Sequence, residues 1–392
     1  MMNVARRWLF LILAAAVLCA FLPGRDTRAD RPVPVRLTLT VSAGEQADLY
    51  SRLDIDSRSI TRAIVRAKKE RVPEPSVLPD VTVRIQAGSG AEQRYRLEPS
   101  GRLWNESAGE RLVLPDAAAI RLLSYAEGLR SRHYGKLVDW DEANKLIPRK
   151  SYFSITDLES GLTFRVQRRA GSDHADVQPL TKEDTRIMKR IYDNHWSWRR
   201  RAILVRNASG LFAASMNGMP HGGDGIPGNN FSGHFCVHFY RSTTHKSDTP
   251  DLEHQLMVHK AAGLVRSFLD AAAPDVLAES FVTAMAYKDA ELIRQAGAGL
   301  DQAKLREWLD RMEEVQSIRI VKPLKEEQDA RPRSAGDADK KSSLTAEVQT
   351  QIAVQRKGGK NCRTAYAFSY ARESADAPWR LKDIVIAETS RS

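Results

Sequence analysis

The stretch Gly233-His-Phe-Cys-Val-His-Phe239 organises the centre of this 392-residue chain. Reactive and apolar side chains alternate along it, which predicts a strand with one chemical face and one aromatic face. The chemical face carries His234, Cys236 and His238. A loop rich in Gly and Asn precedes the strand and begins at His221. We therefore expect the Cys236 thiol to lie between two imidazoles and to face the loop that begins at His221.

The surrounding residues 151–252 predict a β-rich central domain. Runs of alternating residues predict a hairpin at 152–167 and two further strands at 202–206 and 211–216. Residues 168–177 are polar and predict a loop. Thr181 followed by Asp184 is a helix start signal, which predicts a helix over 181–192. Trp198, beside three arginines, is expected at a substrate-binding rim.

The preceding residues 30–150 predict a small α+β domain. Alternation over 33–41 and 81–85 predicts strands, and residues 59–69 predict a short basic helix. A longer helix is predicted to start at Pro115. Its expected buried stripe is Ile120, Leu123, Ala126 and Leu129.

The last part, residues 253–392, predicts helices over 254–272, 274–296 and 301–315, followed by four strands. A charged segment at 325–341 predicts a loop between the first two strands. Helices before a closing sheet that ends in Trp379-Arg-Leu-Lys-Asp383 resemble the nuclear transport factor 2-like (SnoaL-type) cone fold, over about 273–388. The fold class is therefore α+β and multidomain.

The N-terminus predicts export. Arg6 and Arg7 precede an apolar run from Leu9 to Leu22, and small residues before Asp30 suit a signal peptidase. Residues 1–29 are thus a predicted signal peptide, or a membrane anchor if they stay uncleaved. The formal net charge of +11 favours an anionic partner such as peptidoglycan or another envelope polymer. No nucleic-acid-binding motif is visible, so nucleic acid is not an expected partner.

Cys236 with its histidines can be a nucleophile. At this point the residues resemble the exported L,D-transpeptidases of the YkuD type, which carry His-Gly, a loop, and then Ser/Thr-His-Gly-Cys-Ile/Val-Arg. Here His221-Gly222 is followed by Gly233-His234-Phe235-Cys236-Val237-His238. The resemblance implies that Cys236 is the nucleophile, His221 the base and His234 a supporting residue near the oxyanion. Gly222, Gly233 and His238 would then help to bind substrate.

Three positions depart from that family's pattern. Gly233 replaces Ser or Thr, Phe235 replaces the Gly before the cysteine, and His238 replaces Arg. The surrounding strands are compatible with the family's β-sandwich. Backbone N–H groups around 233–236 are the expected oxyanion donors. No cofactor is required by this chemistry, and the expected activity is cysteine-dependent acyl transfer on peptidoglycan peptide stems at the cell envelope.

Two other interpretations fit the same residues. Imidazoles and a thiolate also suit zinc, with His221, His234, Cys236 and His238 as the ligand set. His245 is another possible fourth ligand, and His174 with Asp176 could add more. The zinc site would belong to a hydrolase or be structural. The third interpretation is a non-catalytic protein that binds the cell wall. We expect Cys236 and Cys362 to be free thiols.

Overall fold

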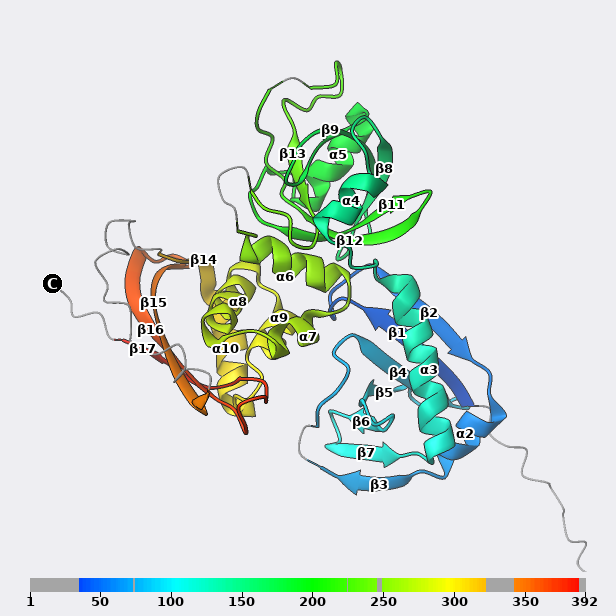
Figure 1. Ribbon diagram of the computed structural model, residues 1–392. Coiled ribbons are helices and arrows are strands. Elements are labelled where there is room, and N and C mark those ends of the chain that lie inside the picture. Colours follow the sequence, from blue (N-terminus) through cyan, green and yellow to red (C-terminus); the bar gives the residue numbers. More distant parts are fainter. Residues whose placement is uncertain (1–34, 73–74, 224, 245–248, 322–341, 388–392) are drawn as a thin grey trace, which may run out of the picture.

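The computed structural model describes residues 35–72, 75–223, 225–244, 249–321 and 342–387. These residues form a mixed α/β structure with several sheets, one of which closes into a six-stranded barrel (Figure 1). The predicted signal peptide, the charged segment 325–341 and His245 lie outside the described residues. Within the described parts, no helix is long and apolar enough to cross a membrane.

The first sheet lies in the N-terminal part and has seven strands in the order β2-β1-β4-β5-β6-β7-β3. Its strands are β1 Val35–Ser42, β2 Tyr50–Ile55, β3 Lys68–Arg71, β4 Val81–Ala87, β5 Gln93–Leu97, β6 Leu103–Asn105 and β7 Glu110–Val113. The helices of this part are α2 Arg58–Val65, α3 Asp116–His133 and α4 Trp140–Leu146. Leu37, Leu39 and Val41 of β1 are buried, as the sequence predicts, and Thr38 between the leucines is buried as well.

The buried stripe of α3 differs from the prediction. Ile120 is 67% exposed, whereas Leu122, Ala126 and Leu129 are buried. The helix packs on β1 and β2 through the side that carries Leu122. Ile120, two residues earlier, therefore points away from the sheet, because successive residues turn about 100° around a helix.

The second sheet is the closed barrel, with strands in the order β10-β13-β12-β11-β8-β9. Its elements are β8 Tyr152–Asp157, β9 Thr163–Ala170, β10 Ala175–Pro179, α5 Lys182–Ile191, β11 Arg201–Asn207, β12 Gly210–Met216 and β13 Phe235–His238. Apolar side chains from every strand fill the interior, among them Phe164, Val177 and Phe235. The six strands form one closed sheet, where the resemblance implied a two-sheet sandwich.

One strand of the barrel was predicted as a loop. Residues 168–177 are polar in sequence, yet Ala175–Pro179 forms β10, and all five of its residues are buried. β10 pairs with β9 on one side and with β13 on the other. The polar side chains on this strand are compatible with burial because other parts of the chain supply their hydrogen-bond partners.

The C-terminal part places helices before an antiparallel sheet in the order β14-β15-β16-β17. Its helices are α6 Leu252–Ala261, α7 Val265–Asp270, α8 Pro274–Tyr287, α9 Ala290–Ala296 and α10 Gln302–Glu314. Its strands are β14 Val315–Ile320, β15 Thr345–Arg356, β16 Asn361–Ala371 and β17 Arg380–Ile386, as predicted. The first two predicted helices are each broken, at Gly263 and at Lys288, where φ is positive.

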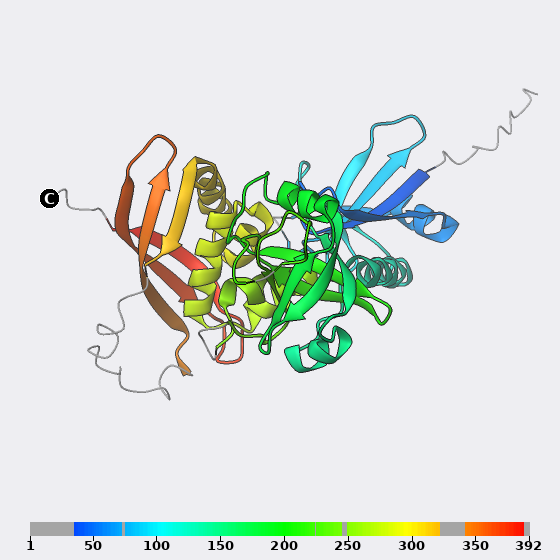
Figure 2. The ribbon, with the colours of Figure 1, turned by 90° about the horizontal axis from the view of Figure 1, so that it is seen from above.

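Helix α6 connects the barrel to the rest of the molecule. It packs on the outer side of β11 and β12 and also reaches β13. Figure 2 shows the barrel beside the central helices, with the N-terminal and C-terminal sheets on opposite sides. The wall of the barrel under α6 is therefore covered, and side chains that point outward from it are buried. The reactive residues lie on this wall.

Candidate functional site

The site is built on the register between two adjacent strands. Asp176 on β10 pairs directly with Cys236 on β13. Phe235 and Val237 belong to the barrel core, so the alternation of the strand turns Cys236 and His238 to the outer face. The sequence predicts this separation of an aromatic and a chemical face. It does not predict Asp176 as a partner of Cys236, because that pairing joins residues sixty positions apart.

A short two-residue bridge brings His221 to the thiol. The backbone N–H groups of His221 and His234 donate to each other's carbonyl oxygens, at 2.9 and 2.8 Å. His221 Nε2 then lies 3.2 Å from Cys236 Sγ. The predicted nucleophile and the predicted base are therefore in hydrogen-bond contact.

Two glycines allow this close approach. Gly222 and Gly233 both have positive φ, at 75° and 82°. A Cβ on Gly222 would lie 2.3 Å from the His234 ring, and one on Gly233 would lie 2.2 Å from the His221 carbonyl oxygen. Their lack of a side chain is thus a requirement of the bridge. Both glycines therefore allow the backbone bridge that places His221 beside Cys236.

The backbone fixes the tautomer of His221. Its Nδ1 lies 2.8 Å from the carbonyl oxygen of Met219, which can only accept a hydrogen bond. Nδ1 therefore carries a proton. In the neutral ring, Nε2 then has a lone pair and faces the thiol, which is the arrangement that a general base requires. The carbonyl of Met219 is the third, orienting group.

His174 approaches the thiol from the buried side. Its Nδ1 lies 2.9 Å from the Thr243 carbonyl oxygen, and its Nε2 lies 3.3 Å from Asp176 Oδ1. Both partners accept hydrogen bonds, so the protonated ring is favoured. Burial opposes the charge, but hydrogen bonds with Asp176 and Cys236 outweigh it and raise the pKa of His174 to about 10.

These contacts act on the thiol. Burial alone would raise the pKa of Cys236, but hydrogen bonds with His174 and His221 outweigh burial and lower it below the usual thiol value. The same contact with Cys236 is the main cause that raises the pKa of His221. The thiolate form, which is the nucleophile, is thus stabilised by two imidazoles on opposite sides.

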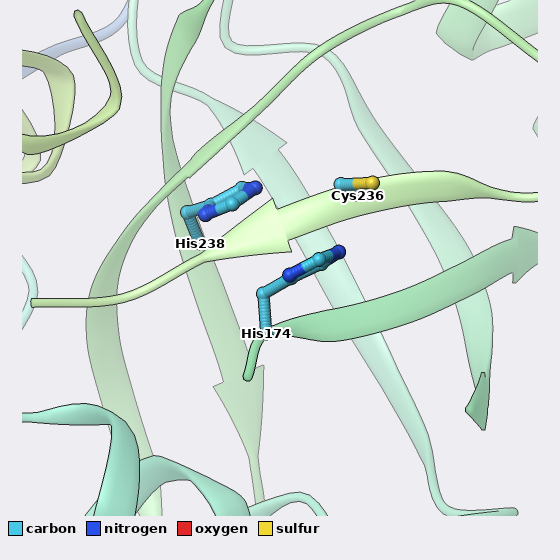
Figure 3. A group of neighbouring side chains, drawn as sticks. All are labelled: His174, Cys236 and His238. Carbon is cyan, nitrogen blue, oxygen red and sulfur yellow. The ribbon is translucent and has the colours of Figure 1, made fainter. Parts of the chain in front are cut away.

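His238 belongs to a stack of three histidine rings behind the thiol. Its ring lies 4.5 Å from that of His174 and 3.7 Å from that of His254 on α6. Figure 3 shows His238 and His174 on the two neighbouring segments, beside Cys236. His238 is 2% exposed, and its Nδ1 lies 3.1 Å from Ser242 Oγ. A positioning role fits this burial better than the expected contact with substrate.

The open side of the site is formed by other residues. Cys236 is 5% exposed, while the side chain of His234 is 18% exposed. Trp198 is 50% exposed, and its ring lies 5.0 Å from that of His221. Trp198, His221 and His234 are thus the more exposed side chains beside the buried thiol. The substrate-binding role expected for Trp198 stays a prediction.

The backbone of the bridge limits the oxyanion site. The N–H of His234 is taken by the His221 carbonyl, so this group is not available as an oxyanion donor. The Gly233 carbonyl accepts a hydrogen bond from Gln178 Nε2, at 2.5 Å, and Gln178 Oε1 accepts one from Ile226 N–H. Gln178 thus ties the glycine-rich loop to β10. His234 Nε2 lies 3.5 Å from Asp176 Oδ1.

The possible metal ligands fall into two groups that share the thiol. One is His221, His234 and Cys236, and the other is His174, Cys236 and His238. Within each group, the ligand atoms lie within 4.8 Å of one another. The predicted set of four is therefore divided between two sides of Cys236. In the buried group, the rings of His174 and His238 are stacked at 15°, so their in-plane lone pairs do not converge on one point.

Two residues of the site, His174 and Asp176, are expected from the sequence only as possible metal ligands in a loop. In the structure His174 directly precedes β10 and Asp176 forms part of it. A signal was present, because apolar Ala175 and Val177 alternate with them. Cys236 and Cys362 are both free, as expected.

Comparisons with known proteins leave the family of the chain open. No family model matches it, and no curated protein or solved structure is significantly similar. The assignment of a function therefore depends on the geometry around Cys236.

Proposed function

We propose that the protein is an exported, envelope-associated cysteine acyltransferase of the L,D-transpeptidase kind. The observation that carries this proposal is the contact of 3.2 Å between His221 Nε2 and Cys236 Sγ, with His221 Nδ1 held by a carbonyl oxygen. A nucleophile, a base in the required tautomer and an orienting acceptor are the three parts of a thiol acyl-transfer site.

In the proposed reaction, His221 takes the thiol proton and Cys236 attacks an amide carbonyl carbon. The carbon–nitrogen bond breaks, the leaving amine takes the proton from His221, and a thioester remains. An acceptor amine or water then gives a proton back to His221 and attacks the thioester, which frees the thiol. His174 and Asp176 stabilise the thiolate before the attack.

The proposed substrate class is the peptide stem of peptidoglycan. Its support is the resemblance of residues 221–238 to the transpeptidase motif, the predicted signal peptide and the basic composition. The exposed ring of Trp198 beside His221 offers an apolar surface for the acyl donor. The proposed location is outside the cytoplasmic membrane.

We also propose that residues from about 273 to 388 adopt the nuclear transport factor 2-like cone fold. Helices α8 to α10 followed by the antiparallel sheet β14–β17 support this proposal. This fold hosts enzymes and binding modules alike, so it adds nothing to the chemistry of the barrel.

Covalent labelling tests the acyltransferase proposal. A β-lactam or another acyl probe is expected to form a thioester at Cys236, detected by mass spectrometry of the peptide that contains it. Cys236→Ala should abolish the adduct, and His221→Asn should slow its formation strongly. Cys362→Ser is the matched control, because Cys362 is exposed and lies on β16. Equal labelling of the wild type and Cys236→Ala contradicts the proposal.

Zinc binding is the second proposal, supported by the two ligand groups around Cys236. Metal analysis of the purified protein separates it from acyl transfer. Near-stoichiometric zinc that is lost in His234→Gln or His238→Gln supports a zinc centre. Labelling of Cys236 by an acyl probe in metal-free protein supports the transferase. Wall binding that survives Cys236→Ala, without turnover, would instead support a non-catalytic protein.

A further inference from the structure

An exposed surface rich in arginine lies on α2, far along the chain from the barrel. Arg58, Arg62, Val65 and Arg66 are all exposed, and we call these four residues the α2 face. They span an arc of about 100° on the helix, since each residue turns about 100°. The buried residues Ile60 and Ile64 lie on the opposite side.

The α2 face is cationic and its charges are available. No described residue forms an ion pair with Arg58, Arg62 or Arg66, and no acidic residue lies in the first turn of α2. Lys68 and Lys69 follow directly on β3, with side chains 77% and 65% exposed. They pair with Glu70 and Glu110, and Asp56 and Asp116 are the exposed acids near the helix. The two lysines are thus offset by their acidic partners, and the positive charge of this surface comes from the three arginines of the α2 face.

An exposed apolar side chain stands among these charges, and a second one lies on the neighbouring helix α3. Val65, within the α2 face, is 68% exposed. Ile120 on the adjacent helix α3 is 67% exposed, and its neighbour Arg121 donates to Ser59 Oγ on α2 at 3.0 Å. A soluble polyanion would satisfy the arginines but would leave Val65 in water. A bilayer surface satisfies both, because headgroups take the arginines and the interface takes the apolar tip.

The α2 face also lies next to the place where the described chain begins. Leu37, near the start of β1, pairs with Ile55 at the end of β2, and α2 starts three residues later at Arg58. Figure 1 shows α2 beside the start of β1. The apolar run that ends at Leu22 is separated from β1 by residues 23–34, a spacer that reaches at most about 40 Å. Any membrane that holds this run is therefore within reach of α2.

We propose that the α2 face docks on a lipid bilayer surface that carries anionic headgroups. Arg58, Arg62 and Arg66 contact the headgroups, and Val65 enters the interface between headgroups and acyl chains. Each arginine removed is expected to lower the affinity for anionic vesicles about fivefold, and high salt weakens the interaction. The surface is independent of Cys236, so the acyltransferase proposal can fail while this one stands.

Hydrogen exchange of the full chain tests the docking. Phosphatidylcholine vesicles with phosphatidylglycerol should slow amide exchange in α2, and vesicles of phosphatidylcholine alone should not, even if the N-terminal run inserts into both. Arg58→Glu with Arg62→Glu should remove this protection. The control variant, Arg319→Glu with Arg363→Glu, makes the same change in charge at exposed positions of the C-terminal sheet. It should keep the protection of α2. Unchanged exchange in β11 and β12 verifies that each variant is folded.

Three outcomes overturn the proposal. The first is equal α2 exchange with neutral and anionic vesicles in the wild type. The second is loss of protection in the Arg319 and Arg363 control as well, which would mark a general charge effect. The third is that dextran sulfate protects α2 as strongly as anionic vesicles do, and that Val65→Ser does not change this protection. That result would assign the face to a soluble polyanion.

Discussion

Asp176 lies directly opposite Cys236 in the register of β10 and β13, and its carboxylate joins three groups of the site. Oδ1 is 3.3 Å from His174 Nε2, 3.5 Å from His234 Nε2 and 4.0 Å from Cys236 Sγ. The carboxylate favours the protonated form of His174, and the protonated ring favours the thiolate. The buried carboxylate of Asp176 therefore stabilises the thiolate of Cys236 indirectly, because it keeps the His174 ring between them protonated.

Asp176→Asn should make Cys236 less reactive. Loss of the carboxylate lowers the pKa of His174, which in turn raises the pKa of the thiol. A higher thiol pKa leaves less thiolate at neutral pH, so the reaction with iodoacetamide should be slower. The rate is measured at the Cys236 peptide by mass spectrometry. Asp173→Asn, an exposed position three residues away, is the matched control, and an equal effect of both variants refutes this role of Asp176.

The pH profile of alkylation should report the pair of Cys236 and His221. Because the pKa of the thiol is lowered, wild-type Cys236 should stay reactive at pH values where a free cysteine is mostly protonated, and should lose reactivity as the pH falls through that lowered pKa. His221→Asn removes one of the stabilising contacts and should shift the midpoint upward. A midpoint that does not move contradicts the contact between these two residues.

Gly233→Ala should disrupt the bridge between His221 and His234. The added Cβ would meet the His221 carbonyl oxygen at 2.2 Å, and the left-handed backbone costs alanine about 1–2 kcal/mol. We expect acyl-probe labelling to fall together with the free energy of unfolding, measured by urea denaturation. Gly223→Ala is the control, since its Cβ meets no atom within 4 Å. Similar labelling of the two variants argues against the bridge.

Trp198→Ala should weaken substrate binding and leave the thiol intact. An aromatic contact contributes about 1 kcal/mol, so the half-saturating concentration of an acyl probe should rise about threefold to tenfold. The reaction of Cys236 with iodoacetamide should not change, because this small reagent does not need to bind against the Trp198 ring. Tyr152→Ala, at another exposed aromatic residue of the barrel, should leave both measurements unchanged. A slower iodoacetamide reaction in Trp198→Ala shows instead that the ring positions His221.

His133→Gln should make the protein more resistant to acid. Burial lowers the pKa of His133 to about 4, whereas the unfolded chain titrates near the usual value of about 6.5. The unfolded state therefore binds a proton first as the pH falls, and stability is lost between these two values. Replacement should recover about 2–3 kcal/mol near pH 4.5, relative to the wild type. The check is urea unfolding near pH 7.5 and near pH 4.5, with the exposed His195→Gln as control. If His133→Gln loses as much stability in acid as the wild type, His133 is not the group responsible for the acid sensitivity.

Local sequence patterns account for most elements around the site. The alternation of residues 233–239 predicts a strand with Cys236 and His238 opposite Phe235, and the structure confirms both faces. Thr181 and Asp184 form the capping box that starts α5, as their spacing predicts. These features are predictable because they depend on residues a few positions apart, whose geometry the backbone period fixes.

The sequence alone therefore determined a thiol set among histidines, with a Gly-rich loop before it. Only the tertiary structure decided which imidazoles reach the thiol and in which state. The alternation around Ala175 hints at β10, but the hydrogen-bond partners that allow its polar residues to be buried lie on β13, at Thr243 and in the loop at Gly233, all distant in sequence. The tautomer of His221 depends on the Met219 carbonyl and on where the loop closes. Strand register and ring orientation are set by long-range packing, and no local period encodes them.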